Sequence, residues 1–448
     1  MPSMAGVDNT IDYMDQASFL GLRARGRDPL IQLFWLYDHP VDLEQLRRFH
    51  RLLGQGLIGR RIERSPLPFG RHRWVAWSGP DDIEVAPTAR PRAEVRQWAV
   101  EQSVKPIDPE RGPSWRLAVL PLTEGGAAVM LIASHTVADG VGGITAVAEA
   151  ADGITRDLGY PLPGSRTKSQ ALLQDSRAFL RELPEVAKSL VAAARVAKKE
   201  GGAPKAKPAV PKAAQGSHFT DEVTVPSITI HIDAKQWDDR AKALGGSGPT
   251  LLLGFGARYG YHLGWLGSDG RANLSVVLSD RKPGDTRGNA LTNVTFPADA
   301  DAVMSDLSEV RADFKAASRR LEENGNELLG PLPLTPFVPM RAVRRLESLV
   351  LREKEVGCSY LGDIDPAVLR PDGTDAAEMV FLPFEQHITY GDLARMDGIF
   401  HPVLAGRVHD KVWISIGFCN AQGTTTRDDL AEVARLTLDD MGLSGVVE

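Results

Sequence analysis

Between an apolar run and a helical pattern, the chain carries the sequence Ser134-His135-Thr136-Val137-Ala138-Asp139-Gly140-Val141-Gly142-Gly143. The junction between a buried strand and a helix is where α/β folds expose side chains to a ligand crevice. A histidine at such a junction can accept a proton near neutral pH, so His135 is a candidate general base. Asp139 suits a tight turn that fixes the backbone around this histidine, and Gly140 lets a substrate chain pass close by.

Strand and helix patterns alternate on both sides of this motif. The predicted elements are a strand over 31–37, helices over 42–53 and 91–102, a hairpin of strands 115–122 and 127–133, and a helix over 141–157. Interleaving of this kind is typical of an α/β architecture.

A change of composition follows these elements. Residues 176–199 are predicted as a helix with an apolar stripe, which Pro184 kinks or interrupts. Residues 200–217 consist mostly of Lys, Ala, Pro and Gly, and this composition predicts a flexible linker. Strand and helix patterns then resume, so we expect an N-terminal subdomain over 1–199 and a C-terminal subdomain over 218–448.

The part after the linker mixes the same two kinds of element. The predicted strands cover 223–232, 273–279, 291–296 and 411–418, and the predicted helices begin near 249 and cover 303–321 and 428–441. Gly256, Gly260 and Gly264 recur at four-residue spacing, which favours a helix packed closely against a sheet.

Bulk properties exclude several classes of protein. The 448 residues are 43% hydrophobic and 25% charged, which suits a soluble chain with two domains. A net charge of −6 gives no field that attracts a polyanion, so we expect no nucleic-acid partner. Two cysteines supply no disulfide framework and indicate a reducing compartment. Residues 1–15 show no secretory pattern, and the apolar stretch 251–265 is too short to span a bilayer, so we expect a cytoplasmic protein.

Three further segments carry a family resemblance together with the His135 motif. They are Met14-Asp15-Gln16-Ala17-Ser18-Phe19, Ser279-Asp280-Arg281 with the downstream Gly288-Asn289, and Ser359-Tyr360-Leu361-Gly362-Asp363. With them the chain resembles the chloramphenicol acetyltransferase-like superfamily of thioester-dependent acyltransferases, and within it most closely the bacterial wax ester synthase/diacylglycerol acyltransferases. The resemblance implies an α/β fold of two similar subdomains, each a mixed β-sheet flanked by helices, with an active-site tunnel between them.

The resemblance also implies roles for individual residues. His135 would take the proton from an acceptor hydroxyl as its oxygen attacks a thioester carbonyl. Asp139 would face away from the substrate and pair with Arg281, which would hold the loop in place. Strand alternation, and not the resemblance, makes Asn293 a candidate for lining the tunnel or supporting the oxyanion, because it lies on the opposite face of its predicted strand from Val294 and Phe296. The residues expected to contact the acyl-coenzyme A co-substrate are Ser359 and Gly362.

The expected activity is transfer of an acyl group, long-chain by the resemblance, from acyl-coenzyme A to an alcohol or lipid acceptor. The product would be an ester such as a wax ester or triacylglycerol, and no cofactor is expected. No metal is expected either, because the irregularly spaced His387, His401 and His409 lack cysteine neighbours.

Several alternatives stay open at this point. The donor can be an acyl-carrier-protein thioester, and the acceptor can be an amine, as in condensation domains. A catalytically silent lipid-binding protein of the same fold is the third reading, because Ser134 stands where many relatives have the first of two histidines and Tyr360 where they often have Asn. Peripheral contact with the inner membrane surface through the stripe in 176–199 is open as well.

Overall fold

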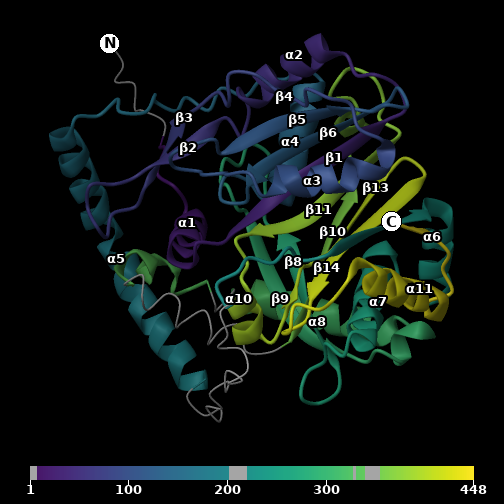
Figure 1. The fold of residues 1–448 in the computed structure, drawn as a ribbon. Helices are drawn as coiled ribbons and strands as arrows, with labels where there is room; N and C mark the ends of the chain where they lie inside the picture. The colour runs from purple at the N-terminus through teal and green to yellow at the C-terminus, as the bar shows by residue number, and fades with distance from the viewer. Residues whose placement is uncertain (1–7, 201–218, 326–328, 339–353) are drawn as a thin grey trace.

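The computed structural model describes residues 8–200, 219–325, 329–338 and 354–448. Within them the chain forms two large mixed β-sheets flanked by helices, as the sequence analysis predicted. In Figure 1 the first sheet, built mostly of N-terminal strands in purple and blue, lies above the second sheet in green and yellow. The predicted linker 200–217 lies outside the described residues apart from Glu200, which ends a helix.

The first sheet has the strand order β11-β1-β6-β5-β4. Its neighbouring strands are antiparallel except β4 and β5, which run parallel. The predicted hairpin is therefore confirmed, and Gly125 in its turn has a φ of 96°. The strands of this sheet are β1 (Asp28–Tyr37), β4 (Glu84–Val85), β5 (Trp115–Pro121), β6 (Ala127–Ser134) and β11 (Glu378–Gln386).

Strand β11 comes from the C-terminal part of the chain but belongs to the first sheet. It pairs with β1 over the register from Asp28 opposite Gln386 to Leu36 opposite Glu378. A division of the chain at residue 218 therefore does not coincide with the division into sheets. Through β11 the C-terminal part of the chain is therefore joined to the N-terminal part along the length of β1.

Helices cover both faces of the first sheet. α2 (Leu43–Leu53) and α4 (Gly140–Ala151) share a core with one face of the strands, and α3 (Val95–Ser103) shares a core with the other. α4 is shorter than the predicted 141–157, because it ends at Ala151 and the chain turns at Gly153, whose φ is 76°. The remaining elements of this part are α1 (Tyr13–Arg25), η1 (Arg92–Glu94), η5 (Pro366–Leu369) and the hairpin of β2 (Arg60–Glu63) and β3 (Arg73–Ala76).

Helix α5 (Lys168–Glu200) runs along the outer edge of the molecule, at the left of Figure 1 and away from both sheets. It starts earlier than the predicted residue 176, and Pro184 lies within it without ending it. The short helix η4 (Leu332–Phe337) packs between α5 and α1.

The second sheet has the order β15-β7-β14-β13-β10-β8-β9, with β12 paired to β14. Its strands are β7 (Ser227–Asp233), β8 (Ala272–Ser279), β9 (Leu291–Ala298), β10 (Glu355–Asp363), β12 (Ile399–Phe400), β13 (Val403–Val408), β14 (Lys411–Cys419) and β15 (Val446–Val447). The helical elements of this half are α6 (Ala234–Ala243), α7 (Gly248–His262), η3 (Ala302–Met304), α8 (Ser308–Asn324), α10 (Tyr390–Met396) and α11 (Arg427–Asp440).

Helix α7 packs closely against β10, as its glycine spacing predicted. A Cβ on Gly256 would lie 2.8 Å from the Cys358 sulfur, and one on Gly260 would lie 2.7 Å from Val356. Gly264 falls beyond the helix end and serves a turn with a φ of 64°. None of the helices in the described ranges has the length and apolarity that crossing a membrane requires.

Candidate active site

A cavity of about 1310 Å³ lies between the two halves and is lined by residues of both. His135 and Gly140 line it from the first half, and β8, β9 and β10 of the second sheet contribute to its wall. Most of its large side chains are apolar: Leu30, Val141, Trp265, Leu266, Val277, Leu291, Leu361, Phe381, Phe384, Met396, Ile399, Phe400 and Leu404. The predicted position of a tunnel between two subdomains therefore corresponds to a real cavity.

His135 follows the last residue of β6, and its ring is held from the other half of the chain. Its backbone N–H donates to the Pro29 carbonyl at 3.0 Å, which continues the pairing of β6 with β1. Its ring Nδ1 lies 2.9 Å from the Oδ1 of Asn289, which stands just before β9. Asn289 is 4% exposed, so this contact is shielded from solvent.

The hydrogen bonds around Asn289 define the tautomer of His135. Asn289 Nδ2 lies 3.1 Å from Asp15 Oδ1 and 3.1 Å from the His135 carbonyl oxygen, and both of these atoms are acceptors. The amide nitrogen must therefore face them, which turns the acceptor Oδ1 toward the ring. Nδ1 of His135 must then carry the hydrogen, and Nε2 keeps its lone pair. Nε2 is thus the ring nitrogen that can take a proton from a substrate in the cavity.

Asp15 of α1 anchors the segment that carries Asn289. Its two carboxylate oxygens accept from the backbone N–H groups of Gly288 at 2.8 Å and Asn289 at 2.7 Å. Its side chain is fully buried, and this burial raises its pKa to about 6, while Arg60 and the N–H donors oppose the rise. A carboxylate with only N–H donors around it is best satisfied in its ionised form.

Arg60 supplies the buried positive charge next to Asp15. Burial lowers its pKa, but its guanidinium is held by the Val137 carbonyl at 2.6 Å and by the Thr286 carbonyl. It also lies over the ring of Trp74, 4.1 Å from the centroid. Arg60 thus connects the His135 loop, through Val137, to the loop that leads into Asn289.

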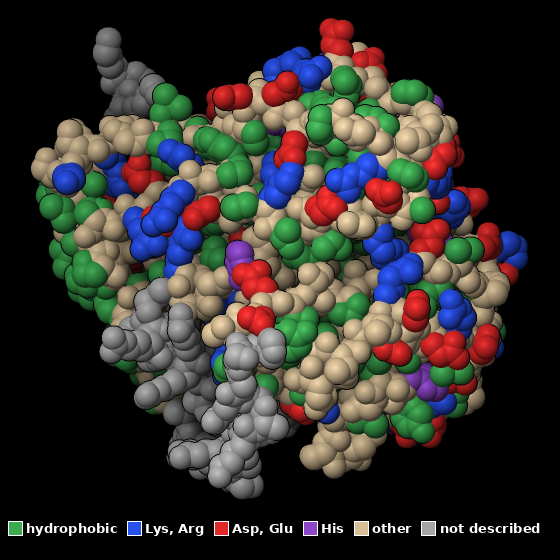
Figure 2. All heavy atoms as spheres, viewed as in Figure 1, with side chains coloured by type: hydrophobic (Ala, Val, Ile, Leu, Met, Phe, Trp, Pro, Cys, Tyr) green, Lys and Arg blue, Asp and Glu red, His purple; other side chains and the backbone are tan. Residues whose placement is uncertain are grey.

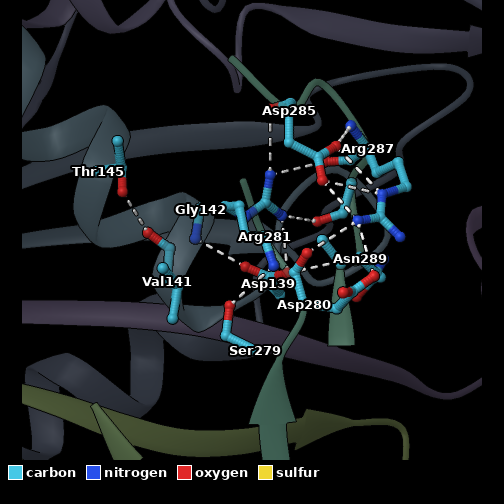
Figure 3. A network of polar contacts seen from close by, with 12 residues as sticks. Asp139, Val141, Gly142, Thr145, Ser279, Asp280, Arg281, Asp285, Arg287 and Asn289 are labelled. Atoms are coloured by element: carbon cyan, nitrogen blue, oxygen red, sulfur yellow. Dashed lines mark hydrogen bonds and ion pairs between the residues drawn. The ribbon is translucent and has the colours of Figure 1, made fainter. Parts of the chain in front are cut away.

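Asp139 and Arg281 form the predicted ion pair, with 2.7 Å between Oδ2 and Nη2 (Figure 3). Both side chains are under 10% exposed. Asp139 also caps α4, because its Oδ1 accepts from the Gly142 N–H at 2.7 Å, and its Oδ2 accepts from the Ala290 N–H at 2.8 Å. Arg281 donates to the Gly288 carbonyl at 2.9 Å. One carboxylate therefore ties the motif helix to the same 288–290 segment that holds the His135 ring.

The glycines of the motif have different surroundings. A Cβ on Gly142 would lie 3.0 Å from Arg281 Nη2 and 3.1 Å from Asp139 Oδ1, so this glycine makes room for the ion pair. A Cβ on Gly140 would meet only side-chain ends of the cavity wall, the nearest at 3.4 Å. Among these glycines Gly140, which lines the cavity, is thus the one that faces a substrate.

Ser134 points away from the cavity. It is fully buried, and its hydroxyl lies 3.3 Å from the Asp28 carboxylate and 3.3 Å from the Thr136 N–H. Its departure from the pattern of two adjacent histidines therefore alters the packing behind β6 and leaves the cavity wall unchanged.

The structure divides the other predicted site residues into two groups. Ser359 and Tyr360 of β10 line the cavity, whereas Gly362 of the same strand does not. Asn293 is not among the lining residues either, and its amide donates to the Ser275 hydroxyl at 3.4 Å. The prediction that Asn293 lines the tunnel is thus corrected, because Leu291 is the residue of β9 that reaches the cavity.

His401, which the sequence analysis considered only as a metal ligand, is a polar residue of the wall. It is 7% exposed, and neither ring nitrogen has a hydrogen-bond partner within the described ranges. Burial lowers its pKa to about 4, with a further contribution from the charge of Arg27, so the ring is neutral. In the described parts of the chain one cluster has metal-type ligands, His231, Glu378 and Glu448, and none of these lines the cavity.

Sequence reasoning missed the residue that orients His135. Asn289 was noted only as part of a family-like Gly-Asn pair, and Asp15 only as part of the opening segment. Arg60 gave no signal at all. The pairing of Asn289 with His135 joins positions 154 residues apart, and no spacing along the chain predicts such a contact.

Comparison with known proteins supports the fold. No protein-family model and no curated protein sequence matches the chain. Among solved structures, it is similar to the first condensation domain of the calcium-dependent antibiotic synthetase in complex with a substrate analogue. The TM-score is 0.58, with 13% identity over 97% of this chain and 96% of that one.

Two further structures cover the chain almost completely. The wax ester synthase/diacylglycerol acyltransferase from Marinobacter aquaeolei VT8 has a TM-score of 0.54, with 16% identity over 97% of this chain and all of that one (100%). The starter condensation domain of rhizomide synthetase has a TM-score of 0.55, with 13% identity over 97% and 94% of the two chains. The chain therefore shares the fold of these condensation domains and of the wax ester synthase, with two mixed sheets flanked by helices, as the resemblance implied.

Proposed function

We propose that this protein is an acyltransferase that moves an acyl group from a thioester to an acceptor by direct attack, with His135 as general base. The observation that carries the proposal is the fixed tautomer of His135 in the wall of the cavity. Asn289 holds the Nδ1 hydrogen, so Nε2 can remove the proton of an acceptor as its heteroatom attacks the thioester carbonyl. The thiol then leaves directly, and no covalent enzyme intermediate is required.

The cavity favours large, mostly apolar substrates. A volume of about 1310 Å³ exceeds the roughly 300–1,000 Å³ of common ligand pockets and leaves room for a donor and an acceptor together. Most of the large side chains in the wall are apolar, leucine and phenylalanine among them, which suits a fatty acyl chain. We therefore propose a long-chain acyl-coenzyme A donor and an alcohol or lipid acceptor, giving an ester.

The likeness to condensation domains favours a second version of the same chemistry. In it, the thioester is carried by an acyl-carrier protein, or the acceptor is an amine. His135, Asn289 and the Asp139–Arg281 pair would act in the same way in both versions, so the distinction rests on substrates and not on the base.

The test is thiol release from a panel of thioesters in the presence and absence of alcohols and amines. Cys358 and Cys419 are both buried, so a thiol reagent will report mainly the released product. We expect release only with an acceptor, and a loss of roughly a hundredfold or more in His135→Ala.

A matched control is His387→Ala. This histidine is half exposed, lies outside the cavity wall and pairs with Glu222 at 2.8 Å, so its loss should leave turnover unchanged. Turnover with carrier-bound thioesters alone would select the second version. Equal turnover by His135→Ala and the wild type would remove His135 as the base, and acyl binding without turnover of any donor would indicate a silent lipid-binding protein.

A further inference from the structure

Helix α5 is amphipathic, but its apolar side faces solvent and not the protein on which it packs. Six of the fourteen large hydrophobic residues that are exposed in the described parts of the chain lie on this one helix. They are Leu172 (45%), Leu173 (53%), Leu180 (63%), Leu183 (41%), Leu190 (59%) and Val191 (53%). A helix on a protein surface normally turns such residues inward.

These six positions form one continuous stripe, which we call the α5 stripe. At 3.6 residues per turn they fall within an arc of about 100°, and from the first to the last they span about 29 Å. The exposed Ala187 lies within the same arc. Figure 2 shows hydrophobic side chains gathered along the left edge of the molecule, where Figure 1 places α5.

The inner face of α5 is held largely by charged groups. Asp175 is buried and contacts Arg166 at 2.7 Å and Arg73 at 3.2 Å. Glu182 pairs with Arg71 at 3.0 Å. Phe179 makes aromatic contacts inward, with Phe69 at a centroid distance of 4.7 Å and with Phe337 at 5.9 Å. The acidic side chains of the helix are thus used against the protein, while its apolar stripe faces solvent.

Basic side chains border the stripe on one side. Arg177, Arg181 and Lys188 are exposed and follow the stripe around the helix within a further arc of about 80°. No residue in the described ranges forms an ion pair with any of the three. A leucine-rich face with an adjacent row of cations matches the chemistry of a bilayer surface that contains anionic lipid.

We propose that the α5 stripe docks the protein on an anionic lipid surface, with the leucines in the acyl boundary and the three cations at the headgroups. Stripe composition favours lipid over a protein partner, since protein interfaces are enriched in aromatic residues and the stripe has none. The surface lies outside the cavity wall, so docking is separable from the acyl transfer proposed above.

Co-sedimentation with phosphatidylcholine vesicles, with and without phosphatidylglycerol, tests the proposal. The triple variant Leu180→Ser, Leu183→Ser, Leu190→Ser should lower binding to both kinds of vesicle by roughly a hundredfold or more. The variant Arg177→Gln, Arg181→Gln, Lys188→Gln should lose only the advantage of the anionic vesicles, about fivefold per residue. A matched control, Val100→Ser, Val104→Ser, Leu436→Ser, removes exposed apolar residues elsewhere and should bind as the wild type does.

A second measurement leaves the stripe intact. A polarity-sensitive dye on Ala187→Cys should shift to the blue on anionic vesicles, and the same dye on the exposed Glu432→Cys of α11 should not. Equal binding of the stripe variant and the wild type would overturn the proposal, as would equal dye shifts. A wild-type dimer that the stripe substitutions convert to monomer would also overturn it, since a second copy would then be the occupant.

Discussion

Replacing Asn289 by alanine tests the central geometry of the site. The substitution removes the acceptor that His135 Nδ1 has within the described residues, a contact of 2.9 Å with a residue that is 4% exposed. Leaving a buried donor unsatisfied costs about 1–3 kcal/mol. The variant bears this cost, whereas the wild type does not, because Asn289 accepts the hydrogen bond in both its ground state and its transition state. If the His135 ring turns or changes tautomer in the variant, the same free energy is added to the barrier of the proton-transfer step. At about 1.4 kcal/mol per factor of ten, kcat should fall roughly ten- to hundredfold.

The matched control is Asn293→Ala, four positions further along the chain. Asn293 is the residue that the sequence placed at the tunnel, but its amide contacts Ser275 and does not line the cavity. Its loss should change kcat by less than about threefold, because its amide contacts Ser275 and not His135. The pair of variants therefore separates the role predicted by sequence from the role assigned by the structure.

The assay is steady-state thiol release with the best donor and acceptor found for the wild type. Asn289 touches the base and not the substrate, so its loss should lower kcat and leave KM within about threefold. Circular dichroism and thermal unfolding establish that each variant is folded at the assay temperature. A larger loss in Asn293→Ala than in Asn289→Ala, or an effect of Asn289→Ala confined to KM, would refute the reasoning.

Four other substitutions probe the support of the site. Asp139→Asn removes the carboxylate that is paired with the buried Arg281, so the free energy of unfolding should fall by about 3–5 kcal/mol in urea titrations; a loss under about 1 kcal/mol would contradict a structural ion pair. Gly142→Ala forces a Cβ within 3.1 Å of that pair and should lower the free energy of unfolding by about 1–3 kcal/mol. Gly140→Ala should lower it by under about 1 kcal/mol, and equal melting temperatures of the two variants would argue against this difference. Burial raises the pKa of Asp28 to about 7, above its unfolded value of about 4. The contribution of neutral Asp28 to the free energy of unfolding is therefore complete below about pH 4 and is lost as the pH rises through 7. Asp28→Asn should therefore be more stable than the wild type at pH 8 but not at pH 4, and parallel stability curves from pH 4 to 8 would exclude this linkage.

Much of the secondary structure and the motif itself could be predicted from local sequence. The hairpin before His135, the strand–helix junction at the motif and the glycine face of α7 each depend on residues within a few positions of one another. The pair of Asp139 with Arg281 was found through a family resemblance, because the two residues lie 142 positions apart and no local pattern relates them.

The limits of the prediction follow from the same distinction. The prediction for Asn293 rests on strand alternation. Alternation shows which residues of a strand share a face, but it does not show how far along that face a cavity extends. The helix predicted after the motif runs to residue 157, but the observed helix ends at Ala151, because the chain turns at Gly153.

By itself, the sequence determined the order of strands and helices, the candidate base His135 and the amphipathic pattern of residues 176–199. Those features depend on periodicity and on neighbours within a turn or two. Only the tertiary structure decided that β11 joins the first sheet, that Asn289 meets His135, and that the α5 stripe faces outward. Each of these depends on which distant segments pack together, and the free energy of that packing is a property of the whole fold and of no single stretch of chain.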